Sequence, residues 1–368
     1  MKVAIVHDYL IDFGGAERVL LALHEIYPEA PIYVSIYRKE KLGKFAKSFE
    51  KIKIIESWFG KLPYAEKIIS PLRFLLPVIW SSFNLSKYDL IIDSSAWAVT
   101  KGFKKRREQI EICYCHTPPR YLYGFDTSRS WNEKWYGKLI QTYAFFVNKY
   151  MRIYDYRSSQ KVDFFIANSK NVEERIKKYY KKDSIVIYPP VETKDVKGIK
   201  ETEYFLAGGR LVASKNFDLI IKACIKENVK LKIFGTGILE TELKRISNEN
   251  IEFLGKVEDN ELFGLYKNAE GFIVAQKDED FGITIVEAES LGCPIIAYQG
   301  GGYLETVTDR TGVFFKQLNI ESIAKAINKS TKTKWNKKII KDYAENFSKN
   351  KFKREIIQFI ETVYAEEN

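Results

Sequence analysis

The sequence predicts an α/β protein with two domains, each built on a doubly wound parallel sheet. Its 368 residues exceed what one hydrophobic core usually serves and suit two domains. Short apolar runs alternate with helical or irregular stretches in both halves, as expected when helices join the strands of a parallel sheet. Between the halves, Pro189-Pro190 breaks the alternation and a polar stretch without periodicity follows, Glu192–Glu203. We place the domain boundary there.

Composition and charge narrow the class of protein. Hydrophobic residues make up 45% of the chain, which is ordinary for a soluble globular protein. No run of about 18 uncharged apolar residues occurs, so no transmembrane helix is expected. His7 and Asp8 follow the first apolar run at once, unlike a secretory signal peptide, and we expect a cytoplasmic protein. The net charge of +11 favours phosphates or anionic lipid as partners. Nucleic acid is disfavoured because no motif for it accompanies the charge.

The four cysteines indicate neither disulfides nor a metal site. Cys113, Cys115, Cys224 and Cys293 form no C-x-x-C pair, and we expect buried free thiols. The three histidines are scattered, so the sequence predicts no zinc site.

The first half contains seven predicted strands. They span Lys2–Val6, Ile32–Ile36, Ile52–Ile55, Leu90–Ile92, Ile110–Tyr114, Val162–Ala167 and Ile185–Ile187. After the first strand, Gly14 and Gly15 stand where a helix opens. Glycines at a helix N-terminus let a phosphate approach the backbone, although a simple tight turn is the alternative. A Rossmann dinucleotide site is not indicated, because G-x-G-x-x-G is absent. Farther along, Ser169 predicts the N-cap of a helix that starts near Asn171.

A histidine ends the fifth of these strands. His116 lies in the stretch CHTPPRYLY, at the carboxyl end of the strand, where α/β sheets bind ligands. A lone histidine is more often structural, so its surroundings alone leave both roles open.

Aromatic and basic residues gather in three segments of the first half. Trp58–Phe83 mixes large apolar residues with Lys61, Lys67 and Arg73, and Lys101–Arg107 adds a basic cluster. The third segment, Trp131–Met151, contains Trp135, Tyr136, Tyr143, Phe145, Phe146 and Tyr150. Such segments can lie in the interface of an anionic membrane. The alternative is a helix packed on the sheet with a solvated basic face.

The second half contains six predicted strands and ends in an amphipathic helix. The strands span Tyr204–Ala207, Leu231–Phe234, Ile251–Leu254, Gly271–Val274, Ile295–Tyr298 and Val313–Phe315, and the helix spans Lys351–Glu366. Arg210 and Lys215 follow the first of these strands and a Gly-Gly turn. An arginine forks onto phosphate oxygens and a lysine supplies a point charge, but surface charges without a ligand are the alternative.

The most informative stretch is Ala275–Glu305. A polar loop that contains Glu279 leads through Phe281 to a predicted helix, which starts at Ile283 or Thr284 and ends near Leu291, with Gly292 as its C-cap. The first-turn N–H groups lack intrahelical partners and attract an anion.

Two carboxylates, Glu279 and Glu287, frame this helix start, and Gly282 between them leaves the backbone accessible. Carboxylates accept hydrogen bonds from sugar hydroxyls, so an anion site with a carboxylate on either side suggests a nucleotide sugar. The alternative is a solvated loop charge and a first-turn glutamate favoured by the helix dipole.

The letters EDFGITIVEA followed by GCPIIAYQGGGYLE resemble the E-x7-E signature of retaining glycosyltransferases of family 4. The resemblance extends more loosely over most of the chain. It implies the GT-B fold, with two Rossmann-like parallel-sheet domains that face a cleft and a C-terminal helix that returns to the first domain. The expected boundaries are 1–188 for an acceptor- and membrane-facing domain, 189–347 for a donor-binding domain and 348–368 for the returning helix.

The resemblance also implies roles for individual residues. Arg210 and Lys215 would hold the donor diphosphate, Glu279 would orient the donor sugar, Glu287 would hold the ribose, and His116 would lie beside the reacting sugar. The donor-binding residues that it implies are Gly14, Gly15, Arg210, Lys215, Val257, Glu279, Phe281, Gly282, Ile283, Thr284 and Glu287, and the catalytic ones are His116, Glu279, Arg210 and Lys215.

The stretches VAIVHDYL, CHTPPRYLY and IVIYPPVE look most like bacterial mannosyltransferases of O-antigen (lipopolysaccharide) or capsule assembly. This implies transfer of a hexose, with GDP-mannose as the favoured donor, to a lipid-linked saccharide. The enzyme would be peripheral on the inner face of the cell membrane, would retain the anomeric configuration, and would need no metal or other cofactor. The alternatives are a UDP-sugar-dependent enzyme of the same fold and a non-catalytic nucleotide-sugar-binding or membrane scaffold protein.

Overall fold

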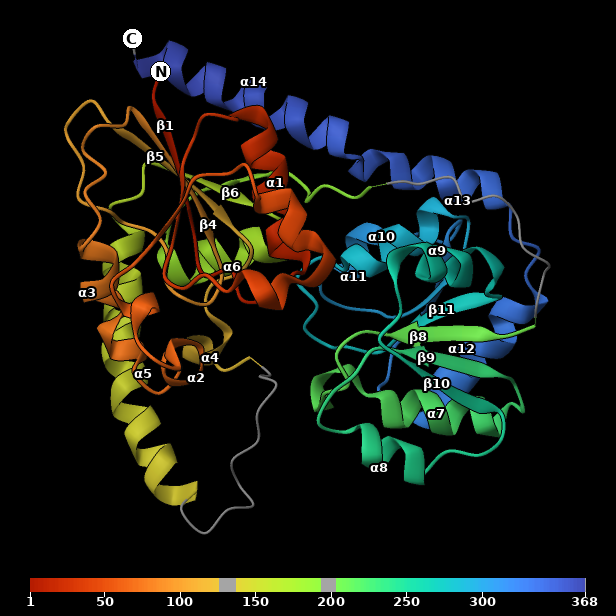
Figure 1. The fold of residues 1–368 in the computed structure, drawn as a ribbon. Helices are drawn as coiled ribbons and strands as arrows, with labels where there is room; N and C mark the ends of the chain where they lie inside the picture. Colours follow the sequence, from red (N-terminus) through yellow and green to blue (C-terminus); the bar gives the residue numbers. More distant parts are fainter. Residues whose placement is uncertain (126–136, 193–202, 368) are drawn as a thin grey trace. The chain divides into compact units, whose positions relative to one another are not determined.

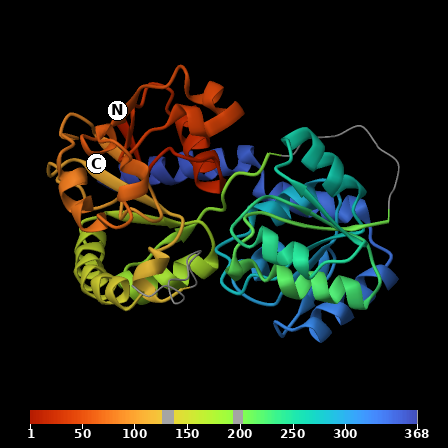
Figure 2. The same cartoon turned by 60° about the horizontal axis from the view of Figure 1, so that its bottom comes forward.

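The computed structural model describes residues 1–125, 137–192 and 203–367. Part of the predicted membrane-facing segment lies outside the described residues, namely Trp131, Trp135 and Tyr136. Most of the predicted linker also lies outside them. The chain forms two compact units, here called unit 1 (Met1–Pro190 with Phe352–Asn368) and unit 2 (Val191–Lys351) (Figures 1 and 2). The boundaries predicted at 188/189 and 347/348 lie two and four residues before those of the units.

Unit 1 is a seven-stranded parallel sheet with helices on both faces. The strands are β1 (Val3–His7), β2 (Ile32–Val34), β3 (Ile54–Glu56), β4 (Leu90–Ser95), β5 (Ile110–Cys115), β6 (Phe164–Ala167) and β7 (Ile185–Val186), in the order β3-β2-β1-β4-β5-β6-β7. Its helices include α1 (Gly15–Ile26), α2 (Ala65–Ile68), α3 (Leu76–Ser81), α4 (Arg120–Tyr123), α5 (Gly137–Ser159) and α6 (Lys170–Tyr180). Every residue of β1, β2, β4 and β5 is buried, as expected for central strands with helices on both faces, whereas the edge strands β3 and β7 are partly exposed. The strand order reverses between β1 and β4.

The last helix, α14 (Lys349–Glu367), completes the core of unit 1. Phe352, Ile356, Ile360 and Val363 are buried in one cluster with residues of α1 and of the first strands. Their spacing of three and four places them on a single helix face. The predicted return of the C-terminal helix to the first domain is therefore confirmed.

Unit 2 repeats the same topology with six parallel strands. These are β8 (Phe205–Gly208), β9 (Leu231–Phe234), β10 (Ile251–Gly255), β11 (Gly271–Val274), β12 (Ile295–Tyr298) and β13 (Gly312–Phe315), in the order β10-β9-β8-β11-β12-β13. The helices are α7 (Phe217–Lys226), α8 (Glu240–Arg245), α9 (Asp259–Asn268), α10 (Ile283–Ser290), α11 (Tyr303–Thr306), α12 (Ile320–Lys332) and α13 (Lys337–Ala344). Here the strand order reverses between β8 and β11. The predicted fold of two Rossmann-like parallel-sheet domains is confirmed.

The apolar insert Trp58–Phe83 folds into short helical turns whose side chains divide between core and surface. Ile69, Leu76 and Trp80 are among those buried in the core of unit 1, whereas Tyr64 and Val78 are exposed. The insert therefore fits both the packed and the interfacial interpretation in part.

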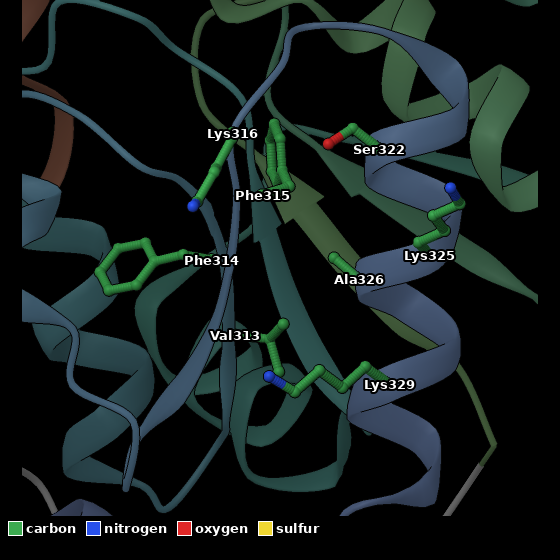
Figure 3. Close-up of a pocket in the computed structure, with 8 residues that line it drawn as sticks. All are labelled: Val313, Phe314, Phe315, Lys316, Ser322, Lys325, Ala326 and Lys329. Atoms are coloured by element: carbon green, nitrogen blue, oxygen red, sulfur yellow. The ribbon is translucent and has the colours of Figure 1, made fainter.

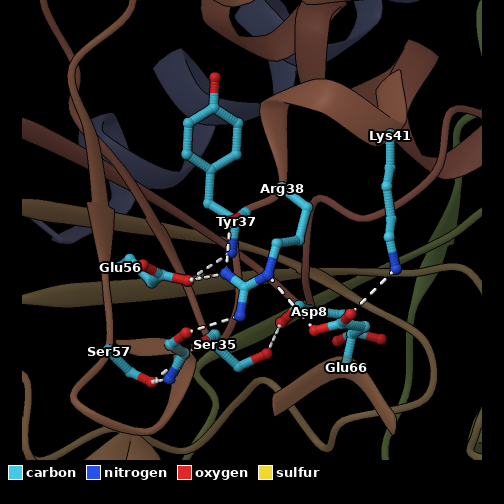
Figure 4. A network of polar contacts seen from close by, with 9 residues as sticks. Asp8, Ser35, Tyr37, Arg38, Lys41, Glu56, Ser57 and Glu66 are labelled. Atoms are coloured by element: carbon cyan, nitrogen blue, oxygen red, sulfur yellow. Dashed lines mark hydrogen bonds and ion pairs between the residues drawn. The ribbon is translucent and has the colours of Figure 1, made fainter. Parts of the chain in front are cut away.

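Arg38 fastens the start of this insert to the sheet (Figure 4). Its guanidinium donates to the Gly60 carbonyl at 2.7 Å, to Glu56 at 2.9 Å and to Glu66 at 3.3 Å. Lys41 donates to the second oxygen of Glu66 at 3.0 Å. A guanidinium has five donors in a rigid fork, so one side chain can fix three segments at once.

Several smaller expectations are also settled. Ser169 caps α6, since its hydroxyl accepts from the N–H of Val172 at 3.1 Å. All four cysteines are buried and free, as predicted. The expectation that Lys101 belongs to an exposed basic cluster is wrong, because Lys101 is 1% exposed and its ammonium pairs with Asp155. In the part of the chain that the structure describes, no helix is long and apolar enough to cross a membrane.

Candidate active site

The strand reversal of unit 2 brings two predicted loops together. In open α/β sheets, ligands bind beyond the carboxyl ends of the strands at the point where the strand order reverses. The loop with Arg210 and Lys215 follows β8, and the loop with Glu279 follows β11. Since β8 and β11 are neighbours in the sheet, these loops meet at that point.

An ion pair joins the two loops. The Lys215 Nζ lies 2.9 Å from Oε2 of Glu279, and the two side chains are 28% and 18% exposed. Next to it, the Asn216 amide donates to the Ala275 carbonyl at 2.7 Å. An ammonium has three donors, so Lys215 can hold Glu279 in place and still donate to a phosphate oxygen.

The glycines after β12 support the loop that carries Glu279. The N–H of Gly302 donates to the Glu279 carbonyl at 2.9 Å. A Cβ at Gly301 would lie 2.6 Å from that same oxygen, so only glycine allows this approach. The Tyr303 hydroxyl donates to Oε2 of Glu279 at 3.4 Å. The glycine run predicted as a loop thus shapes the position of the carboxylate.

The start of α10 is built for a ligand that accepts hydrogen bonds. Gly282 is the N-cap, at a φ of +96° that favours glycine, and it offers no side-chain cap. The preceding Phe281 is buried and packs edge-on against Phe347, with ring centroids 5.4 Å apart. Ile283 and Thr284 in the first turn are partly exposed. The first turn of α10 is therefore accessible to a ligand. An accessible helix N-terminus attracts phosphate.

The remaining predicted donor residues occupy different positions. Glu287 is 3% exposed inside α10. Arg210 is exposed, and its guanidinium has no hydrogen-bond or ion-pair partner among the described residues. Val257 lies in the loop after β10, two strands from β8, and packs on the core of unit 2.

Asp8 occupies the strand reversal of unit 1. Its Oδ2 accepts from the N–H groups of Ala96, Trp97 and Ala98 at 2.5 to 3.2 Å, and its Oδ1 accepts from the Thr100 hydroxyl. A carboxylate that accepts several backbone amides is a strong, charge-assisted acceptor. Asp8 therefore fixes the loop after β4 and has little remaining capacity for a ligand.

His116 follows β5 and contacts the neighbouring strand. Its Nε2 lies 2.8 Å from the Ser94 hydroxyl, which is also 3.0 Å from Nδ1 of His7. Burial, and secondarily the neighbouring His7, lowers the pKa of His116 to about 3. His116 is therefore uncharged at neutral pH and can act there as a hydrogen-bonding group but not as a cation.

The glycine loop after β1 differs from the expected phosphate cradle. Gly15 opens α1, but the N–H of Gly14 donates to Oε2 of Glu17 at 2.7 Å. One of the amides predicted for phosphate is thus bound by the protein itself. Glu17 and Ser94 were missed from the sequence, although a glutamate three residues after the N-cap is the usual signal of a capping box.

A separate pocket in unit 2 contains none of the predicted donor residues. It lies between β13 and α12, has a volume of about 290 Å³ and is lined by Val313, Phe314, Phe315, Lys316, Ser322, Lys325, Ala326 and Lys329 (Figure 3). We do not assign the donor to it. No group of three or more His, Cys, Asp or Glu side chains that could hold a metal occurs in residues 1–125, 137–192 and 203–367.

Two family models match the chain in succession. Residues 13–195 match the model described as Glycosyltransferase Family 4, and residues 191–354 match Glycosyl transferases group 1. Together they span both units.

Two curated relatives cover different shares of the chain. A GDP-mannose-dependent monoacylated alpha-(1-6)-phosphatidylinositol monomannoside mannosyltransferase of Corynebacterium glutamicum is 28% identical over 141 residues, which are 34% of this chain and 37% of that enzyme. An uncharacterized 41.2 kDa protein in the cps region of Klebsiella pneumoniae is 26% identical over 310 residues, 78% of this chain and 81% of that one. The chain thus covers little more than a third of the corynebacterial enzyme's length.

Solved structures share the fold. The Anabaena protein HepE, in complex with UDP and glucose, aligns with a TM-score of 0.72 at 16% identity and covers 98% of this chain and 100% of its own. At this identity the likeness shows the architecture alone.

Proposed function

The chain belongs to the family 4 glycosyltransferases of GT-B fold. We propose that it transfers a hexose to a lipid-linked saccharide, with GDP-mannose as the favoured donor and mannose as the transferred sugar. The observation that carries the proposal is the Lys215–Glu279 pair, which lies at the strand reversal of unit 2. This is where an α/β sheet binds nucleotides.

The donor chemistry follows from these groups. Charge grows on the diphosphate as the glycosidic bond breaks, and Arg210, Lys215 and the amides at the start of α10 stabilise it. Glu279 accepts hydrogen bonds from hydroxyls of the donor sugar, and Glu287 from those of the ribose. Val257 contacts the base of the donor nucleotide. His116 contributes a hydrogen bond to the sugar that is transferred.

Mannose is favoured on two grounds. The stretches of the first half resemble bacterial mannosyltransferases, and the corynebacterial relative is GDP-mannose-dependent. We further propose that transfer retains the anomeric configuration and proceeds without a metal. Chelation with EDTA should then leave the rate unchanged, and NMR of the product should show the α-anomer from an α-linked donor.

The lipid-linked acceptor is supported by an exposed apolar stripe on α5, the long helix drawn in yellow in Figure 1. Residues at alternating spacings of four and three form this stripe, so they lie on one helix face. They are Leu139, Tyr143, Phe146, Tyr150 and Ile153, which are 74%, 39%, 65%, 50% and 49% exposed. Exposed apolar residues that gather in this way mark an interaction surface.

The charges of α5 favour an anionic membrane as the occupant of this surface. The helix carries four cations, Lys138, Lys149, Arg152 and Arg157, and one carboxylate, Asp155. Asp155 is fully buried and neutralised by Lys101, so it does not oppose the cations. A paired helix of a second copy would instead call for acidic partners beside the stripe. We therefore propose that α5 lies in the interface of the membrane that holds the acceptor.

The proposed donor is tested by thermal stabilisation with GDP, GDP-mannose, UDP and UDP-glucose. A ligand that binds only the folded protein raises its melting temperature according to affinity. GDP and GDP-mannose should raise it in the wild type and raise it less in Lys215→Ala. Lys244→Ala is the matched control, because Lys244 is an exposed lysine of unit 2 whose ion pair is with Glu240 on its own helix and which lies outside the predicted donor residues.

The outcomes separate the candidates. Stabilisation by UDP ligands alone would keep the enzyme class and replace the donor. Stabilisation by a nucleotide sugar with neither hydrolysis nor transfer to a lipid-linked saccharide would indicate a binding or scaffold protein. No response to any nucleotide would contradict the proposed donor site.

A further inference from the structure

Four polar side chains of unit 1 form a continuous row of contacts that ends at His116. Glu17 Oε1 lies 3.4 Å from His7 Nε2, His7 Nδ1 lies 3.0 Å from Ser94 Oγ, and Ser94 Oγ lies 2.8 Å from His116 Nε2. All four residues are almost fully buried, between 0% and 8% exposed. They come from the first turn of α1, the end of β1, β4 and the residue after β5.

We propose that Glu17, His7 and Ser94 are positioning residues that keep the proton of His116 on Nε2. The other ring nitrogen, Nδ1, then presents a lone pair to a hydroxyl of the sugar substrate. The role of the lone pair rests on the proposed function, whereas the position of the proton depends only on unit 1.

The direction of each hydrogen bond follows from the carboxylate at the far end. Glu17 is an acceptor only, and its Oε2 already accepts from the Gly14 N–H at 2.7 Å. His7 must therefore donate to Oε1 from Nε2. In a neutral ring Nδ1 is then an acceptor, so the Ser94 hydroxyl gives its proton to His7. A hydroxyl has a single proton, and Ser94 can only accept from His116.

The direction of these hydrogen bonds determines which nitrogen of His116 can accept a hydrogen bond from a substrate. Because burial lowers the pKa of His116 to about 3, the ring carries one proton at neutral pH. With that proton on Nε2, Nδ1 is an acceptor, and no described residue hydrogen-bonds to it. The residue as a whole retains 8% exposure, and the proposal requires that a substrate hydroxyl reach Nδ1 there. Without the row, a free imidazole would divide its proton between the two nitrogens.

One substitution should reverse the whole row. In Glu17→Gln the side-chain oxygen remains on the Gly14 N–H, which is a donor, and the amide nitrogen turns towards His7. His7 Nε2 must then accept, so its proton moves to Nδ1 and is donated to Ser94. Ser94 in turn donates to His116 Nε2, and the proton of His116 moves to Nδ1.

The tautomers are measured by NMR on the full chain labelled with ¹⁵N-histidine, without any substrate. The chain has only three histidines, so His24→Gln and His7→Asn suffice for assignment. We expect His116 as the Nε2–H form in the wild type, as the Nδ1–H form in Glu17→Gln and as a mixture in Ser94→Ala. A wild-type His116 protonated on Nδ1, a doubly protonated His7, or an unchanged His116 in both variants would overturn the proposal.

Activity provides the second measurement. Glu17→Gln should lower kcat about tenfold, the usual worth of one hydrogen bond, with little change in the donor KM. Ser94→Thr keeps the hydroxyl and should retain the wild-type tautomer and rate, which Ser94→Ala should not. Reversed tautomers with an unchanged rate would overturn the role of Nδ1. If the proposed function is wrong instead, no transfer is seen with any variant, yet the tautomers still respond as stated.

Discussion

The two units place polar groups at the same topological position and use them differently. In unit 1 the strand reversal between β1 and β4 is filled by Asp8, whose carboxylate is occupied by three amides and a hydroxyl. In unit 2 the reversal between β8 and β11 holds Lys215 and Glu279, which pair with each other and remain partly exposed. The same sheet topology thus supports an internal scaffold in one unit and a ligand-binding arrangement in the other.

The comparison predicts that substitutions at the two positions fail in different ways. Groups that the protein satisfies internally should cost stability when removed, because their partners are left buried without hydrogen bonds. Groups kept for a ligand should cost binding or rate and leave folding intact. Four experiments test this division, from the largest expected effect to the smallest.

Asp8→Ala should destabilise the protein by about 4 kcal/mol, since three loop amides and the Thr100 hydroxyl lose a charged acceptor. Urea unfolding followed by fluorescence measures this. Asp12→Ala is the control, because Asp12 is exposed and, among the described residues, accepts a hydrogen bond from the adjacent Phe13 N–H alone. A stable Asp8→Ala variant that has lost donor binding would mean that Asp8 contacts the ligand. This result would contradict the scaffold role of the strand reversal in unit 1.

Lys215→Ala should lower kcat about 100-fold, the usual loss when one group that stabilises a developing negative charge is removed. The melting temperature without ligand should stay close to that of the wild type, because the pair is partly exposed and such pairs add little stability. Initial rates of transfer and a thermal scan give both values. A large loss of stability with no specific loss of rate would instead make the pair structural.

The double substitution Phe146→Ser and Tyr150→Ser should weaken binding to vesicles that contain phosphatidylglycerol about tenfold, because it removes apolar area from the middle of the α5 stripe. Vesicle flotation measures the bound fraction. Ile238→Ser is the matched control, since Ile238 is 75% exposed in unit 2 and lies outside the stripe. Equal losses in both variants, or equal binding to neutral vesicles, would count against an anionic membrane surface.

Glu289→Gln should stabilise unit 2 by about 1 kcal/mol at pH 8, where a buried carboxyl is costly. Burial raises the pKa of Glu289 well above its ordinary value, with the Thr311 hydroxyl as a smaller opposing influence. The folded protein therefore holds a proton that the unfolded chain releases above about pH 4.3, so this group's contribution falls as pH rises.

Unfolding measured at pH 5 and pH 8 should show a smaller pH dependence in Glu289→Gln than in the wild type. Destabilisation at pH 8 would show that the carboxylate is ionised and paired. The experiment compares two glutamates of α10, because Glu287 is a predicted ligand-binding residue whereas Glu289 belongs to the scaffold.

Local patterns predicted most of the fold. Each predicted strand is observed, because burial in a parallel sheet favours a continuous apolar segment, whereas the apolar insert Trp58–Phe83 forms short helical turns. The groups of unit 2 could also be found, since Arg210 with Lys215 and Glu279 with Glu287 lie close together in the sequence.

The contacts of unit 1 could not be found in this way. Ser94 meets His7 across 87 residues, and Thr100 meets Asp8 across 92, so neither pairing leaves a local signal. The hydrogen bonds of Arg38 and the burial of Lys101 could not be predicted for the same reason. Each depends on a partner that only the completed sheet brings near.

The path of α14 has a consequence for how the protein is made. Phe352, Ile356, Ile360 and Val363 complete a core that begins with β1 and α1, and all of unit 2 is encoded between them. Because the ribosome emits the chain from the N-terminus, unit 2 can close before unit 1 does. Until α14 emerges, the apolar residues of α1 and of the first strands that it covers stay open to solvent. We therefore expect nascent unit 1 to need a chaperone for longer than unit 2, although it is synthesised first.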